Sequence, residues 1–222
     1  MNNNTLNQTH APPHRPGKLR CLIKALLVIL ALIAGAGALW ELALKDRLIA
    51  RRWGVVESGL IYRSGRLPSS RIAAVLANQR IAVLIDLTEN LPANQLQLQE
   101  RVAAANLGIA YYNFPLRGDG TGDIAHYAQA IQVLHRARRA GQPVLIHCAA
   151  GAQRTGGVVA AYRVLVERRP HAEARAELQR YGWQPGKDQV LLDYLNANMA
   201  ELAARLQTLQ VIETVPNPLP RL

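Results

Sequence analysis

Short apolar runs alternate with amphipathic stretches from about residue 54 to residue 208. A continuous apolar run between turn residues is typical of a buried strand, whereas apolar positions three and four residues apart indicate a helix. The pattern predicts strands over 60–62, 81–87, 109–114 and 143–147. It predicts helices over 68–78, 93–107, 123–140, 155–168, 171–181 and 187–208. Gly108 and Gly141 stand just after two of these helices, where glycine commonly ends a helix.

The alternation of strands and helices favours one fold class. Strand-helix-strand units place successive strands parallel and cover both faces of the sheet with helices. We therefore expect an α/β domain over 54–208, with a mostly parallel central sheet flanked by helices, which is an ordinary size for one domain. Residues 209–222 contain Pro216, Pro218 and Pro220 and are predicted to form a loose C-terminal tail.

The chain before this domain has two parts of opposite character. Residues 1–20 are polar and basic and are predicted to be disordered. Residues 21–44 are apolar apart from Lys24 and Glu41, and about 20 such residues span a bilayer, so we expect a transmembrane anchor. A cleaved signal peptide is the alternative, because small residues alternate over 34–38, and a buried helix of the domain is a third reading. We expect a single-pass protein of the inner (cell) membrane whose folded domain lies on the periplasmic side.

Residues 147–156 read His-Cys-Ala-Ala-Gly-Ala-Gln-Arg-Thr-Gly, between a predicted strand and a predicted helix. Backbone N–H groups in a loop that enters a helix bind anions, and the helix dipole adds to this effect. The same positive field favours a thiolate at Cys148, and the thiolate is the nucleophilic form of cysteine. Arg154 is suited to hold two phosphate oxygens at once. The segment therefore predicts a nucleophile inside a phosphate site, and the alternative is a buried cysteine in an ordinary turn.

This segment resembles the signature of the cysteine-dependent protein tyrosine and dual-specificity phosphatases, in which His-Cys is followed by five residues, Arg, and Ser or Thr. Tyr62-Arg-Ser-Gly-Arg-Leu-Pro also resembles a segment of atypical dual-specificity phosphatases, and a likeness to small exported bacterial members extends over about 55–185. The resemblance implies that Cys148 attacks phosphorus, that a cysteinyl-phosphate forms, and that Thr155 eases the departure of the sulfur. Backbone N–H groups would bind the phosphate at Ala149, Ala150, Gly151, Ala152, Gln153 and Arg154.

The resemblance also implies a general acid on the loop after the preceding strand. That loop contains Asp119 and Asp123. Asp123 stands where a helix begins, and aspartate is a common N-terminal cap, so Asp119 is predicted as the acid and Asp123 is the alternative. Glycines at positions 118, 120 and 122 predict a mobile loop. His147 either orients the backbone of Cys148 or is an ordinary buried histidine.

Composition limits which cofactors and partners we expect for this chain. Cys21 and Cys148 lie in different parts of the chain, and no Cys/His spacing matches a zinc site, so we predict neither a metal nor another cofactor. Residues 45–222 hold 22 Lys or Arg and 14 Asp or Glu, and a basic surface suits a phosphorylated protein or an anionic phospholipid. Aromatic residues make up only 5% of the chain and no nucleic-acid motif occurs, so no nucleic-acid partner is expected.

Three functions follow from these features. The first is a phosphatase of phosphotyrosine or phosphoserine proteins. The second is a phosphatase of a membrane lipid phosphate or a lipopolysaccharide precursor, although the absence of lysine from 149–153 disfavours polyphosphorylated inositol lipids. The third is an inactive module that only binds phosphate.

Overall fold

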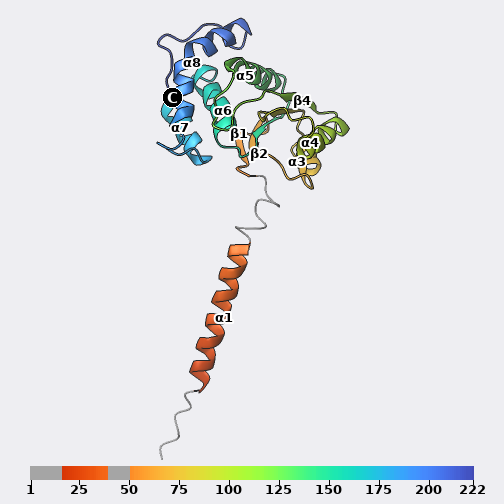
Figure 1. Ribbon diagram of the computed structural model, residues 1–222, viewed down its shortest axis with the longest axis vertical. Helices are drawn as coiled ribbons and strands as arrows, with labels where there is room; N and C mark the ends of the chain where they lie inside the picture. The colour runs from red at the N-terminus through yellow and green to blue at the C-terminus, as the bar shows by residue number, and fades with distance from the viewer. Residues whose placement is uncertain (1–16, 40–50) are drawn as a thin grey trace, which may run out of the picture. The chain divides into compact units, whose positions relative to one another are not determined.

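The computed structural model describes residues 17–39 and 51–222, and the chain divides into two compact units, 1–45 and 46–222 (Figure 1). The described part of the first unit is the helix α1 (Gly17–Leu39). This helix starts inside the segment 1–20 that was predicted to be disordered, and the rest of that segment lies outside the described residues. The end of the predicted anchor, 40–44, also lies outside them.

Every side chain from 21 to 37 in α1 is exposed, although most of them are aliphatic. In the described ranges, 17–39 and 51–222, no helix combines the length and the mean hydropathy of a membrane span. The transmembrane anchor therefore stays a prediction.

The second unit is built on a five-stranded sheet with the strand order β1-β2-β5-β3-β4. Its strands are β1 (Gly54–Glu57), β2 (Ile61–Gly65), β3 (Val83–Asp86), β4 (Ala110–Asn113) and β5 (Val144–Cys148). Strands β2, β5, β3 and β4 are parallel, as predicted, and the edge strand β1 pairs antiparallel with β2. Strand β1 was not predicted, because its four residues are too few to show an alternating pattern.

Helices cover both faces of the sheet, which confirms the expected α/β architecture (Figure 1). On one face lie α3 (Ile72–Asn78) and α4 (Gln95–Asn106), and on the other lie α5 (Ile124–Arg139) and α6 (Gln153–Leu165). Helix α7 (His171–Arg180) packs on α6, and α8 (Gln189–Thr208) packs mainly on α5. Successive side chains of a strand face opposite ways, so Leu145 enters the α3/α4 core and Ile146 the other core. His147 and Cys148 continue this alternation.

Two boundaries differ from the prediction. Helix α6 begins at Gln153, two residues before its predicted start, so the end of the predicted phosphate loop is already helical. The C-terminal segment differs from the loose tail expected over 209–222, because Val211, Ile212 and Leu222 are buried. The side chain of Asn196 donates to the carbonyl of Leu222 at 2.9 Å and accepts its N–H at 2.8 Å, which fixes the end of the chain against α8.

Candidate active site

Cys148 is the last residue of β5, and its side chain is only 1% exposed. The loop after it turns back at Gly151, whose φ is +77°, and the N–H of Gly151 donates to Sγ of Cys148 at 3.1 Å. A hydrogen bond to sulfur stabilises the thiolate more than the thiol. The structure thus brings the predicted nucleophile and its loop together.

The loop packs directly on the end of β2, and glycine is required on both sides. A Cβ on Gly151 would lie 2.5 Å from the backbone nitrogen of Gly65, and a Cβ on Gly65 would lie 3.0 Å from the carbonyl oxygen of Ala149. The N–H of Arg66 donates to that same carbonyl at 3.2 Å. The segment from Ser64 to Arg66 therefore forms one wall of the loop.

Two arginines hold loop carbonyls from outside the loop. Arg52 donates to the carbonyl of Ala150 at 2.9 Å, and Arg63 donates to the carbonyl of Gly151 at 3.1 Å. In a trans peptide the C=O and the following N–H point in opposite directions. The N–H groups of Gly151 and Ala152 therefore point away from the arginines; that of Gly151 points at Sγ of Cys148. The cations hold the two carbonyls on one side of the loop, which leaves the N–H groups of Gly151 and Ala152 on the other side.

Arg63 is a buried cation, since its side chain is 1% exposed. It pairs with Glu177 of α7 at 3.5 Å and lies 4.0 Å from the ring centre of Tyr181. Glu177 also accepts from Arg163 of α6 at 2.9 Å. The sequence pattern did not predict this role of Arg63, because a single arginine in a short strand gives no signal that it is buried.

Arg154 lies on the first turn of α6, is partly exposed, and lines a cleft of about 460 Å³. The other lining residues are Glu89, Pro115, Leu116, Arg117, Gly118, Gly122, Asp123 and His126. The next residue, Thr155, is fully buried, and its hydroxyl donates to the carbonyl of Ser64 at 3.5 Å. The role of Thr155 toward the sulfur stays a prediction.

The loop between β4 and α5 is a small hairpin that closes at Leu116 and Gly122. Tyr127 of α5 donates to the carbonyl of Gly120, and Tyr194 of α8 donates to the carbonyl of Gly122 at 2.7 Å. A Cβ on Gly120 would lie 3.3 Å from the backbone of Gln153, which places this hairpin beside the phosphate loop. The glycines of this loop predicted mobility. In the structure two tyrosine hydroxyls, called here the tyrosine tethers, donate to its carbonyls, and local sequence patterns do not predict such contacts.

Both candidate acids accept hydrogen bonds from their own loop. Asp119 is exposed and accepts from the N–H and the hydroxyl of Thr121, at 2.9 and 2.8 Å. Its slight burial acts to raise its pKa, but the Thr121 bonds and nearby Arg117 outweigh burial and lower the pKa below its ordinary value. Asp123 caps α5 by accepting from the N–H of Ala125 at 2.8 Å, and it lines the cleft with Arg154. Asp119 as the acid stays a prediction.

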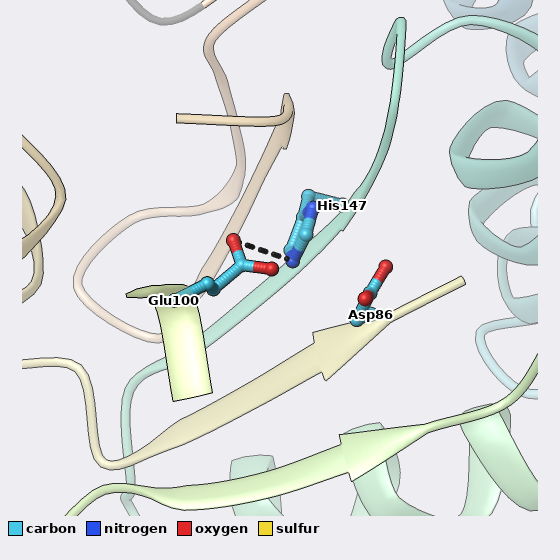
Figure 2. Close-up of side chains that lie close together, drawn as sticks. All are labelled: Asp86, Glu100 and His147. Carbon is cyan, nitrogen blue, oxygen red and sulfur yellow. Dashed lines mark ion pairs between the residues drawn. The ribbon is translucent and has the colours of Figure 1, made fainter. Parts of the chain in front are cut away.

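His147 is completely buried on the α4 side of the sheet (Figure 2). Its Nε2 lies 3.2 Å from Oε1 of Glu100, and its Nδ1 lies 3.4 Å from the carbonyl oxygen of Cys148. The ring is thus both a core side chain and a neighbour of the backbone of Cys148, the predicted nucleophile. Neither Glu100 nor Asp86 was singled out from the sequence, because each comes from a different element.

Asp86, Glu100 and His147 are also the residue types that bind metals, and their donor atoms lie within 4.8 Å of one another (Figure 2). However, the carboxylate of Asp86 already accepts four hydrogen bonds at 2.8–2.9 Å. The donors are the N–H and hydroxyl of Thr88, the side-chain amide of Gln97 and the hydroxyl of Tyr111. About four lone-pair sites are available on a carboxylate, so its acceptor capacity is used. The arrangement fits a hydrogen-bonded network better than a metal centre.

Residues 65–180, just over half of the chain, match the family described as "Dual specificity phosphatase, catalytic domain". The chain belongs to the dual specificity phosphatase family. It is 28% identical over 126 residues to the dual specificity protein phosphatase TpbA of Pseudomonas aeruginosa (strain UCBPP-PA14). That match covers 57% of this chain and 53% of TpbA, so it spans about half the length of that relative.

Solved structures of the dual specificity phosphatase fold superpose on the chain. The crystal structure of P. aeruginosa TpbA gives a TM-score of 0.54 at 21% identity and covers 74% of this chain and 99% of that one. The PP-IP phosphatase SIW14 from S. cerevisiae gives 0.55 at 19% identity and covers 71% and 94%. PTPMT1 gives 0.51 at 18% identity and covers 72% and 98%. At these identities the likeness establishes the fold.

Proposed function

We propose that the chain hydrolyses phosphate monoesters of phosphotyrosine and phosphoserine proteins through a cysteinyl-phosphate intermediate. The observation that carries the proposal is the hydrogen bond from Gly151 N–H to Sγ of Cys148, at the base of a loop that ends in Arg154. The sulfur forms a bond to phosphorus as the bond from phosphorus to the leaving oxygen breaks, and Asp119 gives that oxygen a proton. Water then gives a proton to Asp119, forms a bond to phosphorus as the sulfur–phosphorus bond breaks, and releases the thiolate and inorganic phosphate. Arg154 and the loop N–H groups stabilise the charge on the other phosphate oxygens throughout.

The charges around the cleft support a substrate with one phosphate group. Arg117, Arg154 and His126 line the cleft together with Glu89 and Asp123, and the two carboxylates oppose a substrate with several phosphates. The loop residues 149–153 carry no lysine. Among the structures of similar fold, TpbA has been solved in complex with pTyr, which favours phosphotyrosine as the first substrate to test.

A membrane lipid phosphate or a lipopolysaccharide precursor is the second candidate. PTPMT1, which has the same fold, has been solved in complex with PI(5)P. The basic composition of 45–222 and the exposed aliphatic side chains of α1 support an enzyme that works at an anionic lipid surface. We propose that α1 associates with the inner membrane and that the catalytic unit lies on the periplasmic side.

Replacement of the nucleophile tests the reaction. Cys148→Ser is expected to abolish hydrolysis of an aryl phosphate in a folded protein, because a serine hydroxyl needs a base to activate it and the hydrogen bond at this position comes from a donor, the N–H of Gly151. Arg154→Lys is expected to be nearly as damaging, because lysine keeps the charge but loses the two-pronged contact. The matched control is Arg117→Lys, which changes the same cleft outside the loop and should retain most of the rate.

Substrate class is decided by parallel assays of the full chain on phosphotyrosine peptides, phosphoserine peptides and lipid monophosphates in mixed micelles. A kcat/KM highest for phosphotyrosine supports the proposal, and one highest for a lipid phosphate favours the second candidate. A wild-type chain that binds phosphate but matches Cys148→Ser in every assay would be the inactive module.

A further inference from the structure

Glu100 is a buried carboxyl group without an ordinary hydrogen-bond partner. It lies on α4, its side chain is 1% exposed, and no donor in the described residues makes a hydrogen bond to either of its oxygens. Its one close polar contact in the same ranges is Nε2 of His147 at 3.2 Å (Figure 2). A carboxyl group in such a place costs stability, and a well-packed apolar side chain of similar volume is often as stable or more so. Glu100 is therefore not explained by the needs of the fold.

The contact links Glu100, through the ring of His147, to the backbone of Cys148. His147 precedes Cys148, and its Nδ1 faces the carbonyl oxygen of Cys148 at 3.4 Å. A carbonyl only accepts hydrogen bonds, so Nδ1 must carry a proton to make a favourable contact. Nε2, on the other side of the ring, faces Glu100. With the proton on Nδ1, Nε2 would face the Glu100 carboxylate with a bare lone pair unless one of the two groups holds a further proton.

The charges of Asp86 and Arg66 are consistent with one proton shared between Glu100 and His147. Asp86 of β3 faces the same ring, and burial acts to raise its pKa, but His147 and the hydrogen bonds of Gln97 and Thr88 outweigh burial and lower it. Burial raises the pKa of Glu100, and His147 opposes this effect. Arg66 reaches the cluster by donating to the hydroxyl of Thr88 at 2.9 Å. With Asp86 anionic and Arg66 cationic, a Glu100–His147 pair with one shared proton leaves the whole cluster neutral.

We propose that Glu100 is a positioning residue for the nucleophile. By sharing a proton with Nε2 of His147 it holds the ring in the form that carries hydrogen on Nδ1, and this ring supports the carbonyl of Cys148 and thereby the direction of Sγ. The proposal rests on the proposed function, because it assigns Glu100 to the catalytic step of that reaction.

The test uses the full chain and four variants: Glu100→Met, Glu100→Gln, His147→Asn and the double variant Glu100→Met/His147→Asn. Tyr111→Phe is the matched control, because it removes a polar group from the same buried cluster without touching His147. Three quantities are measured for each: the melting temperature, kcat and KM for an aryl phosphate, and the pH midpoint of the alkylation of Cys148 by iodoacetamide. Activity is divided by the folded fraction.

Glu100→Met is expected to keep or raise the melting temperature while kcat falls roughly 10- to 100-fold and KM changes by about twofold or less, because small displacements of reacting groups cost such factors. The alkylation midpoint is expected to move up by about half a pH unit or more. Glu100→Gln should recover kcat to within about threefold, because its amide N–H donates to Nε2 and keeps the Nδ1–H form. The double variant should be no slower than the worse single variant, since both residues act through one ring.

Additive losses in the double variant, or an unchanged alkylation midpoint in Glu100→Met, would overturn the proposal. So would a lowered melting temperature with normal kcat per folded molecule, which is the signature of a purely structural residue. A wild-type chain without activity on any phosphate ester overturns the proposed function instead, and the alkylation midpoints then still decide the role of Glu100.

Discussion

At the scale of single residues, the loop from Cys148 to Arg154 depends on two glycines, where a side chain would not fit, as much as on the side chains that contact it. Gly151 has φ +77°, and its missing Cβ leaves room for the backbone of Gly65, which in turn contacts Ala149. This close approach lets Arg63 of the same strand reach the Gly151 carbonyl. Two glycines thus set the path of the loop beside Sγ of Cys148, while Arg52 holds its Ala150 carbonyl and Arg63 its Gly151 carbonyl.

The two aspartates of the hairpin are separated by their response to the leaving group. Asp119→Asn is expected to lower kcat about 100-fold or more for tyrosine or alkyl phosphates, but only slightly for a good leaving group that departs without a proton. The basic limb of its pH–rate profile should flatten, since that limb reports the loss of the acid's proton. The slight burial of Asp119 acts to raise its pKa, but the Thr121 hydrogen bonds and Arg117 outweigh burial and lower the pKa below its ordinary value.

Asp123→Ala serves as the comparison. It is expected to cost about 1 kcal/mol of unfolding free energy, the usual value of a helix cap, with nearly normal chemistry. Urea denaturation measures the first quantity, and rates on aryl phosphates of graded leaving-group pKa measure the second. If Asp123→Ala instead shows the leaving-group dependence, the acid is Asp123, which already lines the cleft with Arg154.

At the scale of elements, Glu177 of helix α7 pairs with Arg63, which donates to the Gly151 carbonyl of the predicted phosphate loop. This carboxylate, 14% exposed, pairs with Arg63 of β2 and with Arg163 of α6. Glu177→Ala leaves two guanidinium groups with weaker pairing and is expected to lower the unfolding free energy by about 3 kcal/mol. It should also reduce kcat, because Arg63 loses its anchor beside the Gly151 carbonyl.

A matched change on the same helix checks that this effect belongs to the buried pair. Glu173 of α7 is 58% exposed and lies 3.6 Å from Arg169, so Glu173→Ala should cost less than about 1 kcal/mol and leave kcat unchanged. Chemical denaturation and steady-state kinetics of both variants decide the matter. Equal losses in the two variants would contradict a special role for Glu177.

The elements also show how much of the structure could be predicted from the sequence. Strands β2–β5 and helices α3–α8 were predicted within a few residues, because apolar periodicity and helix-ending glycines are local signals. The candidate site at Cys148 and Arg154 was predicted for the same reason, since its residues stand within seven consecutive positions. Arg63, Glu100 and the tyrosine tethers were not, because their contacts join residues far apart in the chain and depend on how the elements pack.

At the scale of the whole molecule, helix α1 carries a row of exposed aliphatic side chains that water does not favour. We expect an alkaline phosphatase reporter fused after Arg52 to be active in a Gram-negative host, because insertion of α1 would carry the following residues to the periplasmic side. Ile29→Lys together with Leu30→Lys is the matched control, since each lysine at the centre of a membrane segment costs about 2.5–3.5 kcal/mol on insertion scales. The control fusion should be silent, whereas a green fluorescent fusion at the same position should become bright. A silent wild-type fusion with a bright fluorescent counterpart would place the catalytic unit on the cytoplasmic side, and its substrates with it.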